Sequence, residues 1–83
     1  MHHRIREGAL AGEIDWHAEV KALLKAELKR RNVSYRELAE RLERLGVSET
    51  EQNIANKISR GGFSAVFFVQ CLKAVGVRKL RLD

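Results

Sequence analysis

The feature that most constrains this chain is the alternation of residues suited to starting a helix with residues suited to ending one. The starts are Asp15, Ser34, Ser48 or Thr50, and Ser64, and the stops are Asn32, Gly46, Gly61 and Gly76. Ser, Thr and Asp side chains accept hydrogen bonds from the free N–H groups of a first turn. Gly and Asn tolerate the left-handed conformation that ends a helix. Because the sequence contains no proline, nothing interrupts the segments between these marks. The pattern predicts four helices and an all-α domain.

Hydrophobic residues recur at helical spacing within these segments and predict a single core. The second segment opens with Ser34 and Glu37, a capping-box pattern in which the two side chains satisfy each other's N–H groups. Residues 65–75 are apolar nearly all round, so we expect this helix to be buried on more than one side. The predicted core consists of Val20, Leu24, Leu28, Leu38, Leu42, Ile54, Ile58, Phe68 and Leu72, with Leu45 also facing inward.

The two ends of the chain have a different character. Residues 1–14 include two glycines and no clear period, which is typical of a flexible arm. Residues 77–83 fit either a short strand, which would have to pair with another subunit, or a frayed basic tail. We therefore divide the chain into an arm (1–14), a helical domain (15–76) and a tail or strand (77–83).

The charge distribution favours an anionic partner. The chain has 83 residues and a net charge of +5, with the excess at residues 29–31 and after residue 72. A basic excess suits nucleic acid. Solvated helix ends are also often basic, so the charge alone leaves both interpretations open.

The composition argues against an enzyme, a metal centre and a membrane segment. The single cysteine, Cys71, excludes an internal disulfide and lies in an apolar helix, as expected for a small core residue. The three histidines form no ligand pattern, and we expect neither metal nor cofactor. No apolar run is long enough to cross a bilayer. We expect a cytoplasmic protein, with Trp16 as a core or interface anchor.

The second and third predicted helices fit a helix-turn-helix. Ile54 and Ile58 give the third helix a narrow apolar strip, and the opposite face carries Asn53, Asn56, Lys57 and Arg60. In a major groove, Asn can pair with adenine, and Arg or Lys with guanine. Ser34 and the free N–H groups beside it could bind a backbone phosphate, with Tyr35 and Arg36 adjacent. The alternative is that these residues form an ordinary solvated helix face.

Residues 33–42 resemble the second helix of the lambda repressor-like helix-turn-helix family, and residues 58–61 resemble the end of its recognition helix. Residues 64–77 look like its fourth helix. The resemblance implies base contacts from Gln52, Asn53, Asn56 and Lys57. It also implies an enlarged second helix and turn here, because Ala39 and Gly46 are seven residues apart. Residues 15–82 are also similar to a small bacterial domain-of-unknown-function family.

These observations together predict a small bacterial transcription regulator that binds double-stranded DNA as a homodimer, using helix 50–60 for recognition. One alternative is a protein-interaction module that docks through the fourth helix and the C-terminal strand. RNA binding is a further alternative, which the scarcity of aromatic residues disfavours.

Overall fold

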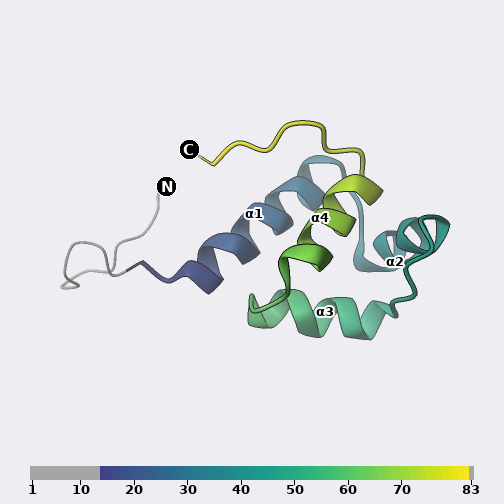
Figure 1. Cartoon of the computed structure of the whole chain (residues 1–83), viewed down its shortest axis with the longest axis horizontal. Helices are drawn as coiled ribbons and strands as arrows, with labels where there is room; N and C mark the ends of the chain where they lie inside the picture. Colours follow the sequence, from purple (N-terminus) through teal and green to yellow (C-terminus); the bar gives the residue numbers. More distant parts are fainter. Residues whose placement is uncertain (1–13, 83) are drawn as a thin grey trace.

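The computed structural model describes residues 14–82, and the chain forms four α-helices over this range. They are α1 (Trp16–Arg30), α2 (Tyr35–Arg44), α3 (Glu51–Arg60) and α4 (Ala65–Ala74). Figure 1 shows α3 running along one side of the molecule, with α4 in front of α1 and α2 at the far end. The predicted all-α fold of four helices is confirmed.

Each helix begins at a side chain that accepts a hydrogen bond from the backbone. The caps are Asp15, Ser34, Thr50 and Ser64, and each accepts from the N–H group three residues further on. Thr50 therefore caps α3, which settles the choice left open between Ser48 and Thr50. The predicted stops also hold, with left-handed backbone at Asn32, Gly46, Gly61 and Gly76.

The capping box at α2 is only half formed. Ser34 Oγ accepts from the N–H of Glu37 at 3.1 Å. The Glu37 carboxylate instead accepts from Arg41, whose Nη2 lies 2.8 Å away. Arg41, four residues further along the helix, therefore binds the Glu37 carboxylate that the capping-box pattern would have placed at the Ser34 N–H group.

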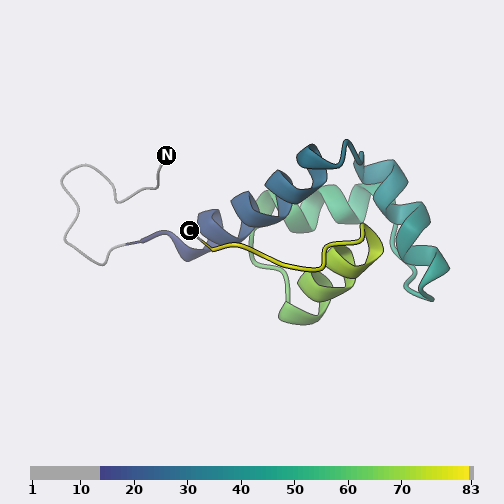
Figure 2. The same ribbon diagram turned by 90° about the horizontal axis from the view of Figure 1, so that it is seen from above.

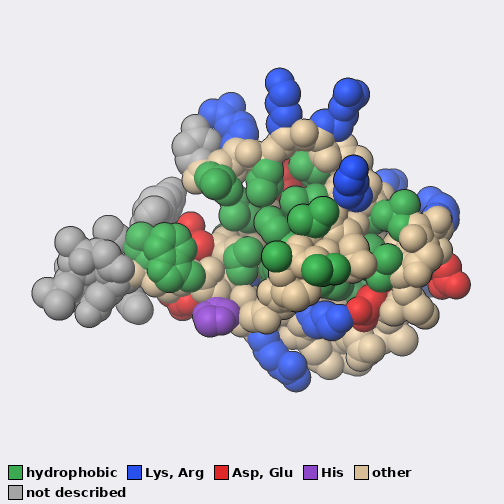
Figure 3. All heavy atoms as spheres, in the orientation of Figure 1, with side chains coloured by type: hydrophobic (Ala, Val, Ile, Leu, Met, Phe, Trp, Pro, Cys, Tyr) green, Lys and Arg blue, Asp and Glu red, His purple; other side chains and the backbone are tan. Residues whose placement is uncertain are grey.

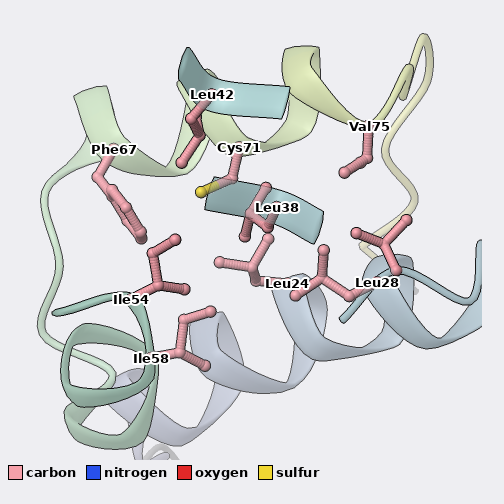
Figure 4. Packing of buried hydrophobic residues seen from close by; sticks show 10 residues of the cluster. Leu24, Leu28, Leu38, Leu42, Ile54, Ile58, Phe67, Cys71 and Val75 are labelled. Atoms are coloured by element: carbon pink, nitrogen blue, oxygen red, sulfur yellow. The ribbon is translucent and has the colours of Figure 1, made fainter. Parts of the chain in front are cut away.

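The helices pack in a crossed arrangement in which α1 and α2 each approach both α3 and α4. Seen from above in Figure 2, α1 and α4 run along opposite sides of the molecule, and α3 lies between them in this view. Side chains from all four helices point into the shared centre (Figure 4). The buried core consists of Leu24, Leu28, Val33, Leu38, Leu42, Ile54, Ile58, Phe67, Cys71 and Val75.

The core prediction is wrong for the face of α4 but correct for six residues of the first three helices, namely Leu24, Leu28, Leu38, Leu42, Ile54 and Ile58. In α4, Phe67 and Cys71 are buried, whereas the predicted Phe68 and Leu72 are only half-buried. The helix is therefore rotated by one residue, about 100°, from the predicted orientation. Val20 is also half-buried, at the open end of α1. The predicted core position of Cys71 is confirmed.

Two further apolar residues differ from expectation because they lie beyond the packed surfaces. Leu45 follows the last residue of α2 and is 52% exposed instead of facing inward. Trp16, the first residue of α1, is 67% exposed, so its expected core role is wrong and its interface role stays a prediction.

The structure also bears on the predictions for the two ends of the chain. Residues 77–82 follow α4 without forming a strand, so the tail is the form observed in the described chain. Of the predicted arm, residues 1–13 lie outside the described residues. Within residues 14–82, no helix has the length and apolar character needed to cross a membrane.

Candidate nucleic-acid interface

The predicted recognition helix, α3, rests on the core by a narrow strip and turns the rest of its surface outward. Ile54 and Ile58 are fully buried. At 100° per residue, an outward arc of about 120° carries five exposed residues and no carboxylate. These are Gln52, Asn53, Asn56, Ser59 and Arg60. We call this set the α3 outer face.

A hydrogen bond orders the side chains in the middle of the α3 outer face. Gln52 Nε2 donates to Asn56 Oδ1 at 3.2 Å. This contact leaves the Gln52 carbonyl oxygen and the Asn56 amide N–H groups available. An acceptor beside a donor is the arrangement that a base edge in the major groove can match.

Lys57 is placed differently from the other predicted base-contacting residues. Its ammonium forms an ion pair with Glu49 and lies 4.7 Å from the centre of the Phe67 ring. Because Glu49 belongs to the connection after α2 and Phe67 to α4, Lys57 joins three parts of the chain. The structure thus gives Lys57 partners within the protein. An open pocket beside it is lined by Lys57, Arg60, Gly62, Phe63, Ser64 and Phe67.

The C-terminal end of α3 is fixed against the beginning of α1. Lys21 Nζ donates to the backbone carbonyl of Ser59 at 3.1 Å. Gly61 ends α3 with a φ of 70°, and a Cβ there would lie 2.5 Å from the His17 carbonyl oxygen. Arg60 is exposed directly beside this contact, so its side chain extends from a firmly held segment of backbone.

The residues predicted to contact phosphate lie at the start of α2. Ser34 and Arg36 are exposed, and Tyr35 is half-buried against the core. The Ser34 hydroxyl satisfies one N–H group of the first turn. The other free N–H groups and the positive end of the helix dipole remain available to an anion.

The connection between α2 and α3 is longer than in a typical helix-turn-helix. Six residues, 45–50, separate the two helices, whereas such turns usually have three or four. This agrees with the enlarged turn expected from the spacing of Ala39 and Gly46. The ion pair between Glu49 and Lys57 ties the connection to α3.

Two acidic residues with structural roles, Glu27 and Glu49, were not predicted from the sequence. Glu27 is 6% exposed and pairs with both Arg30 and Arg31. The hydrogen bond with Arg30 lowers the pKa of the Glu27 carboxyl, burial opposes this effect, and the Arg31 bond lowers it further. The spacing of three and four residues was a usable signal for this cluster. No local spacing indicated the pairing of Glu49 with Lys57.

The chemistry of Cys71 agrees with a core position. Burial raises the pKa of its thiol to about 12. The thiol therefore stays protonated at neutral pH and is a poor nucleophile. Among residues 14–82, no three His, Cys, Asp or Glu side chains converge into a group that could hold a metal ion.

The fold and this surface define the class of protein as a small four-helix domain with a polar helix face. Residues 16–80 match the family described as domain of unknown function DUF6471, so the chain belongs to that family. The match runs from the first residue of α1 past the end of α4 and includes both candidate helices. No helix-turn-helix family matched the chain. No curated protein and no solved structure matches it either.

Proposed function

We propose that this chain is a bacterial transcription regulator that binds double-stranded DNA, with α3 in the major groove. The observation that carries the proposal is the α3 outer face. A helix held by two isoleucines presents amides and an arginine over an arc without a carboxylate. Amide and guanidinium groups are the side chains best suited to reading base edges.

The local charges are compatible with approach to DNA, although residues 47–63 have no net charge. Glu49 is neutralised by Lys57. Glu51, the other acid, lies about 100° around α3 from Gln52, on the side away from Asn56. Repulsion of phosphates by these two carboxylates is therefore weakened at the outer face itself.

The start of α2 supports the same orientation. Ser34 and Arg36 are exposed beside free N–H groups, which commonly position a protein on a phosphate. Because α2 and α3 pack directly on each other, a phosphate contact at α2 would help to fix the angle at which α3 enters a groove. The fold of helix, turn and helix is the lambda repressor-like feature that this proposal uses.

The decisive experiment is selection from randomised duplex DNA at moderate salt, run in parallel with an Asn56→Ala/Arg60→Ala variant. We expect an enriched motif that the variant loses, with Arg60→Ala alone weakening specific binding by about 1–3 kcal/mol. Lys29→Ala is the matched control, because it removes one exposed cation from the end of α1. It should weaken binding about equally for all sequences.

Enrichment that survives in the Asn56→Ala/Arg60→Ala variant would contradict the proposal, as would no enrichment at all. Either result would make α3 an ordinary solvated helix. The expected homodimer stays a prediction, which the same selection tests. A palindromic motif with half-sites about 34–36 Å apart would indicate a twofold dimer.

A further inference from the structure

The outside of α4 carries two exposed valines with an exposed lysine beside them. Val66, Val69 and Lys73 fall within an arc of about 60° when the helix is viewed down its axis. Val66 is 66% exposed and Val69 is 52% exposed. We call these three residues the α4 stripe. Two adjacent valines exposed at helical spacing suit contact with another apolar surface.

The charged residues of α4 and of the segment that follows it, up to residue 82, have one sign. Lys73, Arg78 and Lys79 are exposed at the C-terminal end of the α4 stripe. The sequence contains no Asp or Glu between residues 52 and 82. In Figure 3, hydrophobic side chains gather over the middle of the face where α4 lies, and Lys and Arg side chains stand along the edge where the tail runs.

Two acidic side chains in segments next to α4 are already paired with other basic residues. Glu49 is paired with Lys57 near the start of α4. Glu27 is paired with Arg30 and Arg31 on α1. Lys73, Arg78 and Lys79 are exposed, so their charges are accessible to carboxylates of a partner from outside the domain.

A second copy of the chain does not complement this surface. In a parallel twofold pair, Lys73 of one α4 would face the Lys73 of the other. In an antiparallel pair, Lys73 would face the positive N-terminal end of the other α4, near Arg60. Both arrangements bring like charges together, which opposes association.

We propose that the α4 stripe and the adjoining basic tail dock an acidic amphipathic helix of another protein. Such a helix would place apolar side chains on Val66 and Val69 and carboxylates against Lys73, Arg78 and Lys79. Nucleic acid would satisfy the cations but would leave the valines without an apolar partner. This proposal goes beyond DNA binding and does not depend on it.

The test uses a synthetic helical peptide of about 18 residues, long enough to be partly helical in water. It carries Leu at every third and fourth position and Glu on both sides of that strip. Its binding to the full chain is followed by amide chemical shifts in nitrogen-15 spectra. We expect saturable shifts in α4 and the tail, with none on the α3 outer face.

Two control peptides separate the contributions of charge and apolar contact. One replaces every Glu by Gln, and the other replaces every Leu by Ser. Each should bind roughly tenfold more weakly or not at all, since both features are needed. Equal binding of either control peptide would overturn the proposal.

Matched variants then locate the contact. Val66→Ser/Val69→Ser should weaken peptide binding by about tenfold, whereas Leu45→Ser, which alters an equally exposed apolar residue elsewhere, should not. Should the valine variant unfold, Lys73→Glu/Lys79→Glu gives an independent test. That variant should lose the Glu peptide and bind a peptide with Lys in place of Glu.

Three outcomes would refute this assignment. The first is unchanged peptide binding by the valine variant. The second is sedimentation of the free chain as a dimer that Val66→Ser/Val69→Ser converts to a monomer, since a second copy would then occupy the stripe. The third is duplex DNA producing the same shifts in α4 and the tail. A failed DNA selection would leave the peptide result unaffected, so the two proposals fail separately.

Discussion

Helices α3 and α4 have ten residues each, and both pack on α1 and α2, yet the sequence defined their orientations unequally. In α3, only Ile54 and Ile58 are large and apolar, and both are buried as predicted. In α4, large apolar residues surround the axis, and the predicted side was wrong. The comparison teaches that polar residues orient a helix as much as apolar ones do, since they mark the side that must face water.

The orientation of α4 can be tested most sensitively by truncating its two neighbouring phenylalanines. Phe67→Ala should reduce the free energy of unfolding by about 3–5 kcal/mol, because the ring is 4% exposed and its loss leaves a cavity. Phe68→Ala should cost clearly less, since that ring is half-buried. Urea unfolding of both variants measures the difference. Equal losses would mean that α4 is not oriented as described.

A smaller effect should come from the start of α3. Thr50→Ala removes the hydroxyl that accepts from the Asn53 N–H at 3.0 Å, and should cost about 1 kcal/mol of stability. Ser48→Ala, its control in the same connection, should change stability by less than about 0.5 kcal/mol. Thermal melts of the two variants measure the two losses of stability. A larger loss for the Ser48→Ala variant would mean that Ser48, and not Thr50, caps α3.

The ion pair that joins α3 to the connection before it should contribute less again. A double-mutant cycle with Glu49→Gln and Lys57→Met isolates their ion pair, for which we expect a coupling of about 0.5–1 kcal/mol. The partial exposure of Lys57 limits the value. Chemical denaturation at low salt and at high salt provides the measurement. If Lys57→Met instead left stability unchanged and abolished sequence-specific DNA binding, Lys57 would be a base-contacting residue and not a link between helices.

The smallest effect concerns Glu27 on α1, the helix on which both α3 and α4 rest. Its pKa is lowered in the folded chain from an ordinary value of 4.5, so the stabilisation is present above that value. It is lost as the pH falls through the lowered pKa. Glu27→Gln should cost about 0.5 kcal/mol at neutral pH and should flatten the acid side of the stability profile. Glu40→Gln, at an exposed position, is the control for the loss of stability at neutral pH.

Local chemistry explains which parts of the fold could be predicted. Caps and stops act within a few residues, so Ser34, Ser64, Gly46 and Gly76 could be assigned from the sequence. The buried positions of α2 and α3 followed from strongly amphipathic patterns. Leu45 was misplaced because it continues the apolar spacing of Leu38 and Leu42, although α2 ends at Arg44.

The candidate site divides in the same way. Exposure of Asn53, Asn56 and Arg60 follows from the helical period and was predicted. The contacts of Lys57 were not predicted, because the turn brings Glu49 to it and the rotation of α4 brings Phe67 to it. Contacts between separate elements depend on how the elements pack, and no pattern within one helix contains that information.

The contact between Gly61 and the His17 carbonyl determines where a label or a fused protein attached ahead of α1 would lie. Because α1 begins where α3 ends, any group attached ahead of α1 leaves the domain beside Arg60. A fluorophore placed there would serve as a built-in reporter of whatever occupies the far end of α3. A bulky fusion partner at the same position would act as a competitor for that occupant.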